Sequence, residues 1–305
     1  MFHKPKKMLL LLLCLLLCML TLSACNTSAY ETTTPHLVAA NKLAELMAQP
    51  NVVVVDMQSA EEYAVAHLPG AVNIQASEIV INVPVKNMLT SAKKLEKLLS
   101  EKGIGNDTTI IAYDANRMSA ARFFWTMLCY SSDKVLVVDG GLDAIKAAKL
   151  ELTAEVPVIT PATYVAGEKN KQWLAEMSDV QAQINEPDKN TLLLDVRSDA
   201  EYAQDGKIPS SILWDFNDQF YRDGTYKDTQ TTQINFLQKA MRPENTILMY
   251  CQTSMRAAPV FLQLYDAGYR NIKIYDGAYL EWSSNPNNPI DRPTGSLAPT
   301  KKDAS

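Results

Sequence analysis

The sequence predicts an α/β fold of two tandem domains, each a parallel sheet covered by helices on both faces. Short apolar, β-branched runs alternate along the chain with helical stretches such as residues 91–103 and 256–268. Near-continuous apolar strands suit a parallel sheet that is buried on both faces. The same pattern then occurs twice, and 305 residues are enough for two cores of ordinary size.

Three pairs of segments carry the repeat. Residues 52–74 share a pattern with 192–214, while residues 109–125 align with 246–262 and residues 135–145 with 272–282. In the first pair Asp56 and Asp195 lie 139 positions apart, whereas the later pairs are offset by 137. A drift of two residues over a whole domain indicates a tandem duplication.

The N-terminus predicts export. "MFHKPKK" is basic, and the apolar run that follows, residues 8–20, has 13 residues, which is short for a spanning helix and typical of a signal peptide. "LSAC", ending at Cys25, resembles a bacterial lipobox and implies that Cys25 is lipidated. We therefore expect an extracytoplasmic protein of the cell envelope, anchored to a membrane through lipid. An ordinary signal peptide with an incidental cysteine is the alternative.

The remaining boundaries follow from composition and from the repeat. After a lipoprotein signal peptide over 1–25, we expect a polar tether (26–36), an inactive first domain (37–150), a linker rich in Pro and Thr (151–167), a catalytic second domain (168–293) and a flexible tail (294–305).

Composition excludes several functions. A net charge of -5 leaves no basic footprint, so no nucleic-acid partner is expected. Of three histidines, His3 lies in the targeting segment, which leaves His36 and His67. That is little material for a multi-His metal site or a Ser-His-Asp triad. We expect neither a metal nor a cofactor.

Two cysteines remain in the mature chain, Cys129 and Cys251, because Cys14 and Cys18 leave with the signal and Cys25 carries lipid. They form either one disulfide or two separate thiols. The repeat favours separate thiols, and we expect Cys129 to be buried and inert.

Cys251 stands between an apolar run and a helix that begins near Arg256. The thiolate is the nucleophile, yet a free cysteine is mostly protonated at neutral pH. Inward-pointing backbone N–H groups of the loop, the positive end of the helix and the charge of Arg256 would each favour the thiolate. A packed strand cysteine is the alternative interpretation.

These motifs, with Asp-x-Arg (195–197) before Glu-Tyr (201–202), Tyr-Asp-Gly (275–277) and Glu-Trp (281–282), resemble the tandem rhodanese sulfurtransferases over about residues 37–293. The resemblance implies that a cysteine of the second domain holds a sulfane sulfur as a persulfide. In the first copy Asp114 and Ser119 stand where the second has Cys251 and Arg256. A carboxylate cannot take up sulfur, so the first copy is expected to be inactive.

The resemblance implies transfer of a sulfane sulfur from a donor such as thiosulfate or 3-mercaptopyruvate to a thiophilic acceptor such as cyanide or a thiol. A thiol protein is a further candidate acceptor. The expected site comprises catalytic Cys251, a substrate-binding loop of Gln252, Thr253, Ser254, Met255 and Arg256, and supporting Asp195 and Arg197. Related phosphatases use Cys-x5-Arg; the shorter Cys-x4-Arg spacing here favours sulfur over phosphate.

Departures from the family leave the substrate open. Gln252, Thr253 and Glu201 stand where the animal thiosulfate enzymes have basic residues, and Ser254 stands where the mercaptopyruvate enzymes often have Gly. A left-handed backbone at Ser254 would therefore carry a modest cost. One alternative is a non-catalytic binding or scaffold lipoprotein. Another is a redox protein with Cys251 as a thiol switch, which the lack of a nearby resolving cysteine argues against.

Overall fold

The structure is a computed structural model that describes residue 30 and residues 34–293. The predicted signal peptide with Cys25, most of the predicted tether and the predicted tail lie outside the described residues. The last tether residue, His36, is bound to Asp266, which accepts from its backbone N at 2.8 Å and lies 2.9 Å from its Nδ1. In the described part of the chain, no helix is long and apolar enough to cross a membrane.

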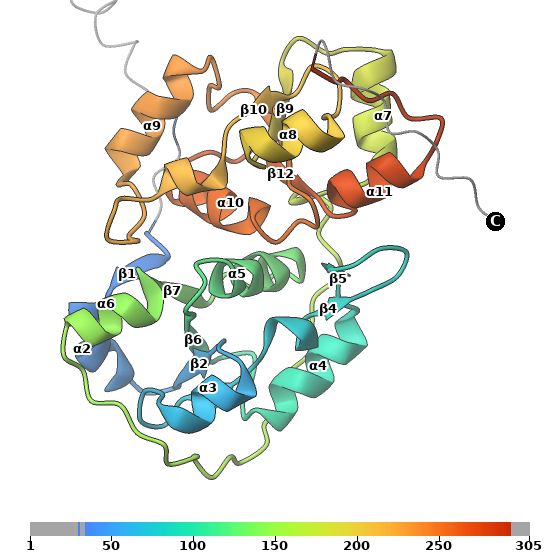
Figure 1. The fold of residues 1–305 in the computed structure, drawn as a ribbon. Helices are drawn as coiled ribbons and strands as arrows, with labels where there is room; N and C mark the ends of the chain where they lie inside the picture. Colours follow the sequence, from blue (N-terminus) through green and yellow to red (C-terminus); the bar gives the residue numbers. More distant parts are fainter. Residues whose placement is uncertain (1–29, 31–33, 294–305) are drawn as a thin grey trace, which may run out of the picture.

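The first domain is built on a five-stranded parallel sheet with the strand order β1-β7-β6-β2-β3 (Figure 1). Its strands are β1 (Leu37–Ala39), β2 (Val52–Asp56), β3 (Val72–Asn73), β6 (Thr109–Tyr113) and β7 (Val135–Asp139). Its helices are η1 (Ala40–Lys42), α2 (Leu43–Met47), α3 (Ala60–Val65), η2 (Ala76–Glu78), α4 (Ala92–Glu101), α5 (Ser119–Cys129) and α6 (Gly141–Ala147). A short antiparallel hairpin joins β4 (Val80–Ile81) to β5 (Met88–Leu89).

The second domain repeats this topology, with the parallel order β8-β12-β11-β9-β10. Its strands are β8 (Leu174–Ala175), β9 (Thr191–Asp195), β10 (Ile212–Leu213), β11 (Thr246–Tyr250) and β12 (Ile272–Tyr275). Its helices are α7 (Met177–Asn185), α8 (Asp199–Asp205), η3 (Phe216–Gln219), α9 (Thr229–Gln238), α10 (Ala257–Asp266) and α11 (Ala278–Ser284). Residues 151–173 join the domains without a helix or strand. The matching strand orders confirm the predicted duplication and fold class.

Successive side chains of a strand point to opposite faces of the sheet. Helices cover both faces, so neighbouring strand residues are buried on opposite sides. In the first domain Val55 and Ile110 pack on the side of α4 and α5. Their neighbours Val54 and Ile111 pack on the side of α2 and α6. The covering helices on both faces are those that the apolar strand sequences predicted.

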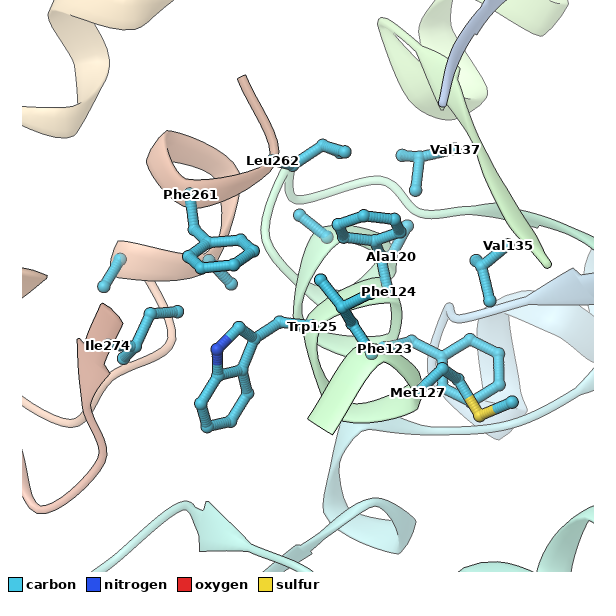
Figure 2. Packing of buried hydrophobic residues seen from close by; sticks show 14 of the residues in the cluster. Ala120, Phe123, Phe124, Trp125, Met127, Val135, Val137, Phe261, Leu262 and Ile274 are labelled. Carbon is cyan, nitrogen blue, oxygen red and sulfur yellow. The ribbon is translucent and has the colours of Figure 1, made fainter. Parts of the chain in front are cut away.

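Helices α5 and α10 join the two domains into one apolar core (Figure 2). All residues of α5 are buried, and its Phe124 and Trp125 lie in the same cluster as Phe261 and Leu262 of α10. Full burial of each large apolar side chain contributes about 1.5–3 kcal/mol. The Nε1 of Trp125 donates to the carbonyl of Trp173 at 3.0 Å. This packing fixes where residues of the first domain meet the loop that follows β11.

Candidate active site

Cys251 is the first residue after β11, and residues 251–256 form a loop, called here the Cys251 loop, that leads into α10. Arg256 is the N-cap of α10, and Pro259 is tolerated because it lies in the first turn. The strand and helix therefore meet at the residues that the sequence predicted. Cys251 is 1% exposed, and its carbonyl accepts from the backbone N of Tyr279 at 2.9 Å.

Ser254 holds the tight turn of the Cys251 loop. Its φ of +58° is left-handed, which costs a residue with a side chain roughly 1–2 kcal/mol. In the first copy Arg117, at the equivalent position, has a φ of +61°. Ser254 therefore does adopt a left-handed angle, and both copies share the loop shape.

Residues of the first domain hold the Cys251 loop from across the interface. Arg122 of α5 is fully buried and donates through Nη1 to Oγ of Ser254 at 3.0 Å. Its Nη2 donates to Oδ1 of Asp276 at 2.9 Å and to the carbonyl of Asn87 at 2.8 Å. Asn87 in turn donates through Nδ2 to Oγ1 of Thr253 at 3.0 Å. The side chains of Ser254 and Thr253, expected to bind substrate, thus bind the first domain.

Sequence reasoning missed Arg122, Asn87 and Asp276 as partners of the loop. One signal was available, since Arg122 is an arginine in the otherwise apolar run "AARFFW", where a buried charge requires a partner. That partner, Asp276, lies 154 residues away and is itself 5% exposed. Asp276 also accepts from the backbone N of Leu89 at 2.7 Å.

The charge of Arg256 is paired with Glu201 of α8. Nη1 and Nη2 of Arg256 donate to the two carboxylate oxygens of Glu201 at 2.7 and 2.5 Å. Ser198 also donates to Glu201 through its backbone N and its hydroxyl, both at 3.0 Å, in a capping box. Burial raises the pKa of Glu201, but these donors outweigh it and hold the pKa at about 2. The positive charge of Arg256 is therefore present, but a carboxylate that the sequence did not predict there is paired with it.

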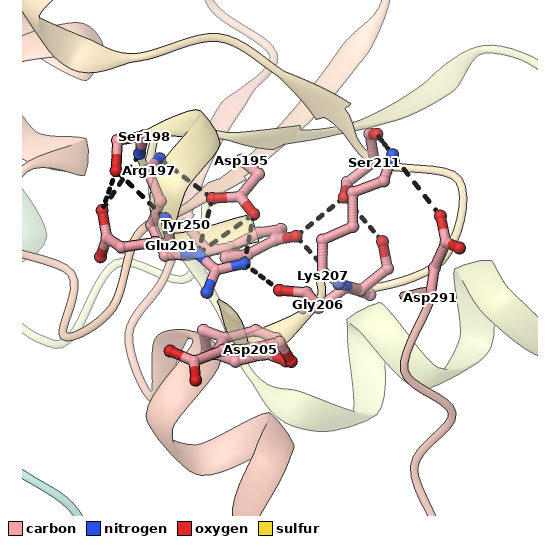
Figure 3. A network of polar contacts seen from close by, with 12 residues as sticks. Asp195, Arg197, Ser198, Glu201, Asp205, Gly206, Lys207, Ser211, Tyr250 and Asp291 are labelled. Atoms are coloured by element: carbon pink, nitrogen blue, oxygen red, sulfur yellow. Dashed lines mark hydrogen bonds and ion pairs between the residues drawn. The ribbon is translucent and has the colours of Figure 1, made fainter. Parts of the chain in front are cut away.

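Asp195 and Arg197 form a buried salt bridge behind the loop (Figure 3). Nη2 of Arg197 donates to Oδ2 of Asp195 at 2.6 Å and to the carbonyl of Gly206 at 2.7 Å. The guanidinium also lies 3.8 Å from the ring centroid of Tyr279, the residue that binds the carbonyl of Cys251. The expected salt bridge is confirmed, and it ties β9 and α8 to α11.

The first copy shows what this loop shape binds. The Asp114 carboxylate, at the position of Cys251, accepts from the backbone N of Arg117 and of Ala120, both at 2.8 Å. Burial raises the pKa of Asp114, while these backbone N–H groups act in the opposite direction. The loop therefore forms an anion-binding nest of backbone N–H groups, and its own side chain occupies it.

Cys129 has no part in this site. It is fully buried at the end of α5, and burial raises the pKa of its thiol far above the ordinary value despite the charge of Arg122. Cys129 and Cys251 are both free thiols, which confirms the prediction of separate thiols. Within the described residues, no cluster of three or more His, Cys, Asp or Glu side chains could hold a metal ion.

The rhodanese-like domain family matches residues 39–148 and 176–285, so the chain belongs to the rhodanese-like family, with two copies of its domain. A thiosulfate sulfurtransferase of Corynebacterium glutamicum is 26% identical over 84% of this chain and 90% of its own length. Thiosulfate/3-mercaptopyruvate sulfurtransferase 2 of Arabidopsis thaliana is 28% identical over 75% of this chain and 76% of its own length. The chain is an enzyme of the sulfurtransferase class.

Solved structures share the fold. Wild-type EanB has a TM-score of 0.77 at 20% identity, covering 84% of this chain and 69% of that chain. The crystal structure of YnjE has a TM-score of 0.72 at 24% identity, covering 84% of this chain and 68% of that chain.

Proposed function

We propose that this protein transfers a sulfane sulfur through a persulfide on Cys251, from a donor such as thiosulfate or 3-mercaptopyruvate to a thiophilic acceptor such as cyanide or a thiol. A protein that carries a thiol is one candidate for the thiol acceptor. The observation that carries the proposal is the shared loop shape. Its nest holds a carboxylate in the first copy and presents a cysteine at the same position in the second.

The reaction has two displacements. With thiosulfate, the Cys251 thiolate attacks the outer sulfur, a bond forms from Sγ to that sulfur, and the S–S bond breaks with its electron pair leaving on sulfite. Cyanide then attacks the sulfane sulfur, thiocyanate forms, and the electron pair of the broken S–S bond restores the thiolate. The intermediate is an anion like the one it replaces, so one nest serves both states.

The residues around Cys251 have different roles in the proposed reaction. Backbone N–H groups of the Cys251 loop and the N-terminus of α10 stabilise negative charge on the terminal sulfur. Arg122, Asn87 and Asp276 hold the loop in its left-handed turn. Because Cys251 is 1% exposed, the persulfide would be sheltered from water, and small donors suit the site best.

Intact mass tests the proposal. The mature chain, incubated with thiosulfate or 3-mercaptopyruvate and desalted, should gain the mass of one sulfur atom and lose it again with cyanide. The Cys251→Ser variant should gain nothing, because an alcohol neither ionises nor attacks sulfur comparably, while Cys129→Ser should behave as wild type. No gain in the wild-type chain with either donor would contradict the proposal and favour a non-catalytic binding protein.

We further propose that the protein is lipid-anchored in the cell envelope through Cys25, as the lipobox-like "LSAC" indicates. Replacement of Cys25 by Ala should leave the chain unprocessed or released from membranes. A Cys25→Ala variant that is cleaved and membrane-bound as before would contradict the anchor.

A further inference from the structure

Among the described residues, the guanidinium at the end of the Cys251 loop and the one that contacts the loop from the first domain are both neutralised. Arg256 is paired through two hydrogen bonds with Glu201, and Arg122 is paired with Asp276. Within the loop itself, the residues that follow Cys251 before Arg256 carry no charge. Each cation that the structure places on the loop thus has a carboxylate beside it.

Glu201 is held in place independently of any ligand. It is the N3 residue of the α8 capping box, so both Ser198 donors fix its carboxylate before Arg256 adds two more hydrogen bonds. Its side chain is 28% exposed, and that of Arg256 is 23% exposed. A donor that needs the charge of Arg256 must compete with a carboxylate that is already positioned.

Sulfur donors differ in how much they need that charge. Thiosulfate brings two negative charges toward a thiolate, and without a free cation only the partial charges of backbone N–H groups offset them. A persulfide, R–S–SH, brings at most one negative charge, and none in its protonated form. When the thiolate attacks its outer sulfur, the S–S bond breaks, and the electron pair and the proton leave together as R–SH. A fixed carboxylate therefore opposes thiosulfate more strongly than it opposes the persulfide, which is discrimination by a repulsive element.

We propose that Glu201 is a specificity-determining residue, which neutralises Arg256 and selects persulfides, which carry at most one negative charge, over dianionic donors such as thiosulfate. The inference rests on the proposed function, since it concerns which donor delivers sulfur to Cys251.

The test compares two donors on the same thiolate. Sulfur transfer to cyanide is measured with thiosulfate and with 2-hydroxyethyl persulfide for wild type and Glu201→Gln. Glutamine at N3 retains the capping box while removing the charge. The readout is the ratio of kcat/KM for thiosulfate to that for the persulfide, because a change in Cys251 nucleophilicity cancels in the ratio. Glu62→Gln is the matched control, since Glu62 makes the same capping box with Ser59 in the first copy.

Glu201→Gln should raise the ratio at least about tenfold, mainly through a lower KM for thiosulfate, and Glu62→Gln should leave it unchanged. An unchanged ratio in Glu201→Gln, with Cys251 still gaining sulfur by mass, would overturn the role of Glu201 and leave the proposed function standing. Failure of Cys251 to gain sulfur from either donor in both proteins would instead overturn the proposed function together with this inference.

Discussion

Nη1 of Arg122 lies 3.0 Å from Oγ of Ser254, and this hydrogen bond crosses from the first domain into the Cys251 loop of the second. The two residues are 132 positions apart and both are fully buried. The first copy, which has no cysteine in its own loop, therefore supports the loop of the other copy. This contact gives the duplicated domain a structural reason to be retained within the chain.

Arg122→Gln should destabilise the protein by about 3 kcal/mol, because it leaves Asp276 buried without its charged partner. Urea unfolding measures this. Arg117→Gln is the matched control, since Arg117 also reaches the second domain, 4.9 Å from the ring centroid of Phe220, but is exposed. Its exposed cation–π contact should contribute under about 1 kcal/mol. Equal losses in the two variants would contradict a special role for Arg122.

The strand, loop and helix around Cys251 could be predicted from sequence. The ion pairs and hydrogen bonds that distant elements make with this loop could not. The apolar run predicted a strand that ends near Cys251 and a helix that begins near Arg256, and β11 ends at Tyr250 and α10 begins at Ala257. Such predictions are possible because strand and helix formation depend on neighbouring residues. Alignment of the two copies found Asp114 opposite Cys251. Both of these inferences use only residues that are close in the chain or repeated at a fixed offset.

The partners of the loop depend on how distant elements dock. Glu201 was noted as a departure at a position that is basic in related enzymes, but its ion pair with Arg256 requires the placement of α8 beside the loop. The contacts of Arg122 require the packing of α5 on α10. No periodicity in a single sequence encodes such pairings, so the ion pair of Arg256 with Glu201 could not be predicted.

Ser254→Gly and Ser254→Ala should differ in stability by about 1 kcal/mol in favour of glycine. Both variants lose the hydroxyl that binds Arg122, but only glycine adopts a φ of +58° without steric cost. Thermal or urea unfolding of the pair measures the difference. Arg117→Gly and Arg117→Ala should differ in the same direction, since Arg117 has a φ of +61°. Greater stability of the alanine variant in both pairs would contradict backbone strain at these positions.

Arg256→Ala should raise the pH at which Cys251 reacts half-maximally with iodoacetamide, by about one pH unit. The substitution removes the cation beside Cys251 and leaves the Glu201 carboxylate without its charged partner. Arg256→Ala combined with Glu201→Gln should recover part of the change, because the uncompensated negative charge is then gone as well. A pH profile identical to that of wild type would mean that backbone dipoles alone set the reactivity.

Glu201 should contribute to stability in a pH-dependent way. Its pKa of about 2 lies below the ordinary value of 4.5, so the contribution is fully present above pH 4.5 and is lost as the pH falls toward 2. Because the pair is partly exposed, we expect about 1–2 kcal/mol. Wild type should therefore exceed Glu201→Gln in unfolding free energy at pH 6, and the difference should shrink by pH 3. Glu62→Gln, without an arginine partner, should show a smaller difference at pH 6.

Asp114→Cys in a Cys251→Ser background should not gain sulfur from thiosulfate, although it places a thiol in a loop of the same shape. The first loop ends in Ser119, where the second has Arg256, so its thiolate would depend on backbone N–H groups alone, and the site is 4% exposed at Asp114. Adding Ser119→Arg should bring partial sulfur loading, because a guanidinium would then stand at the end of the first loop, as Arg256 does at the end of the second. Intact mass after incubation with thiosulfate separates the single from the double substitution. Loading of Asp114→Cys alone would show that the nest, without a guanidinium at its end, is sufficient to activate a thiol for sulfur transfer.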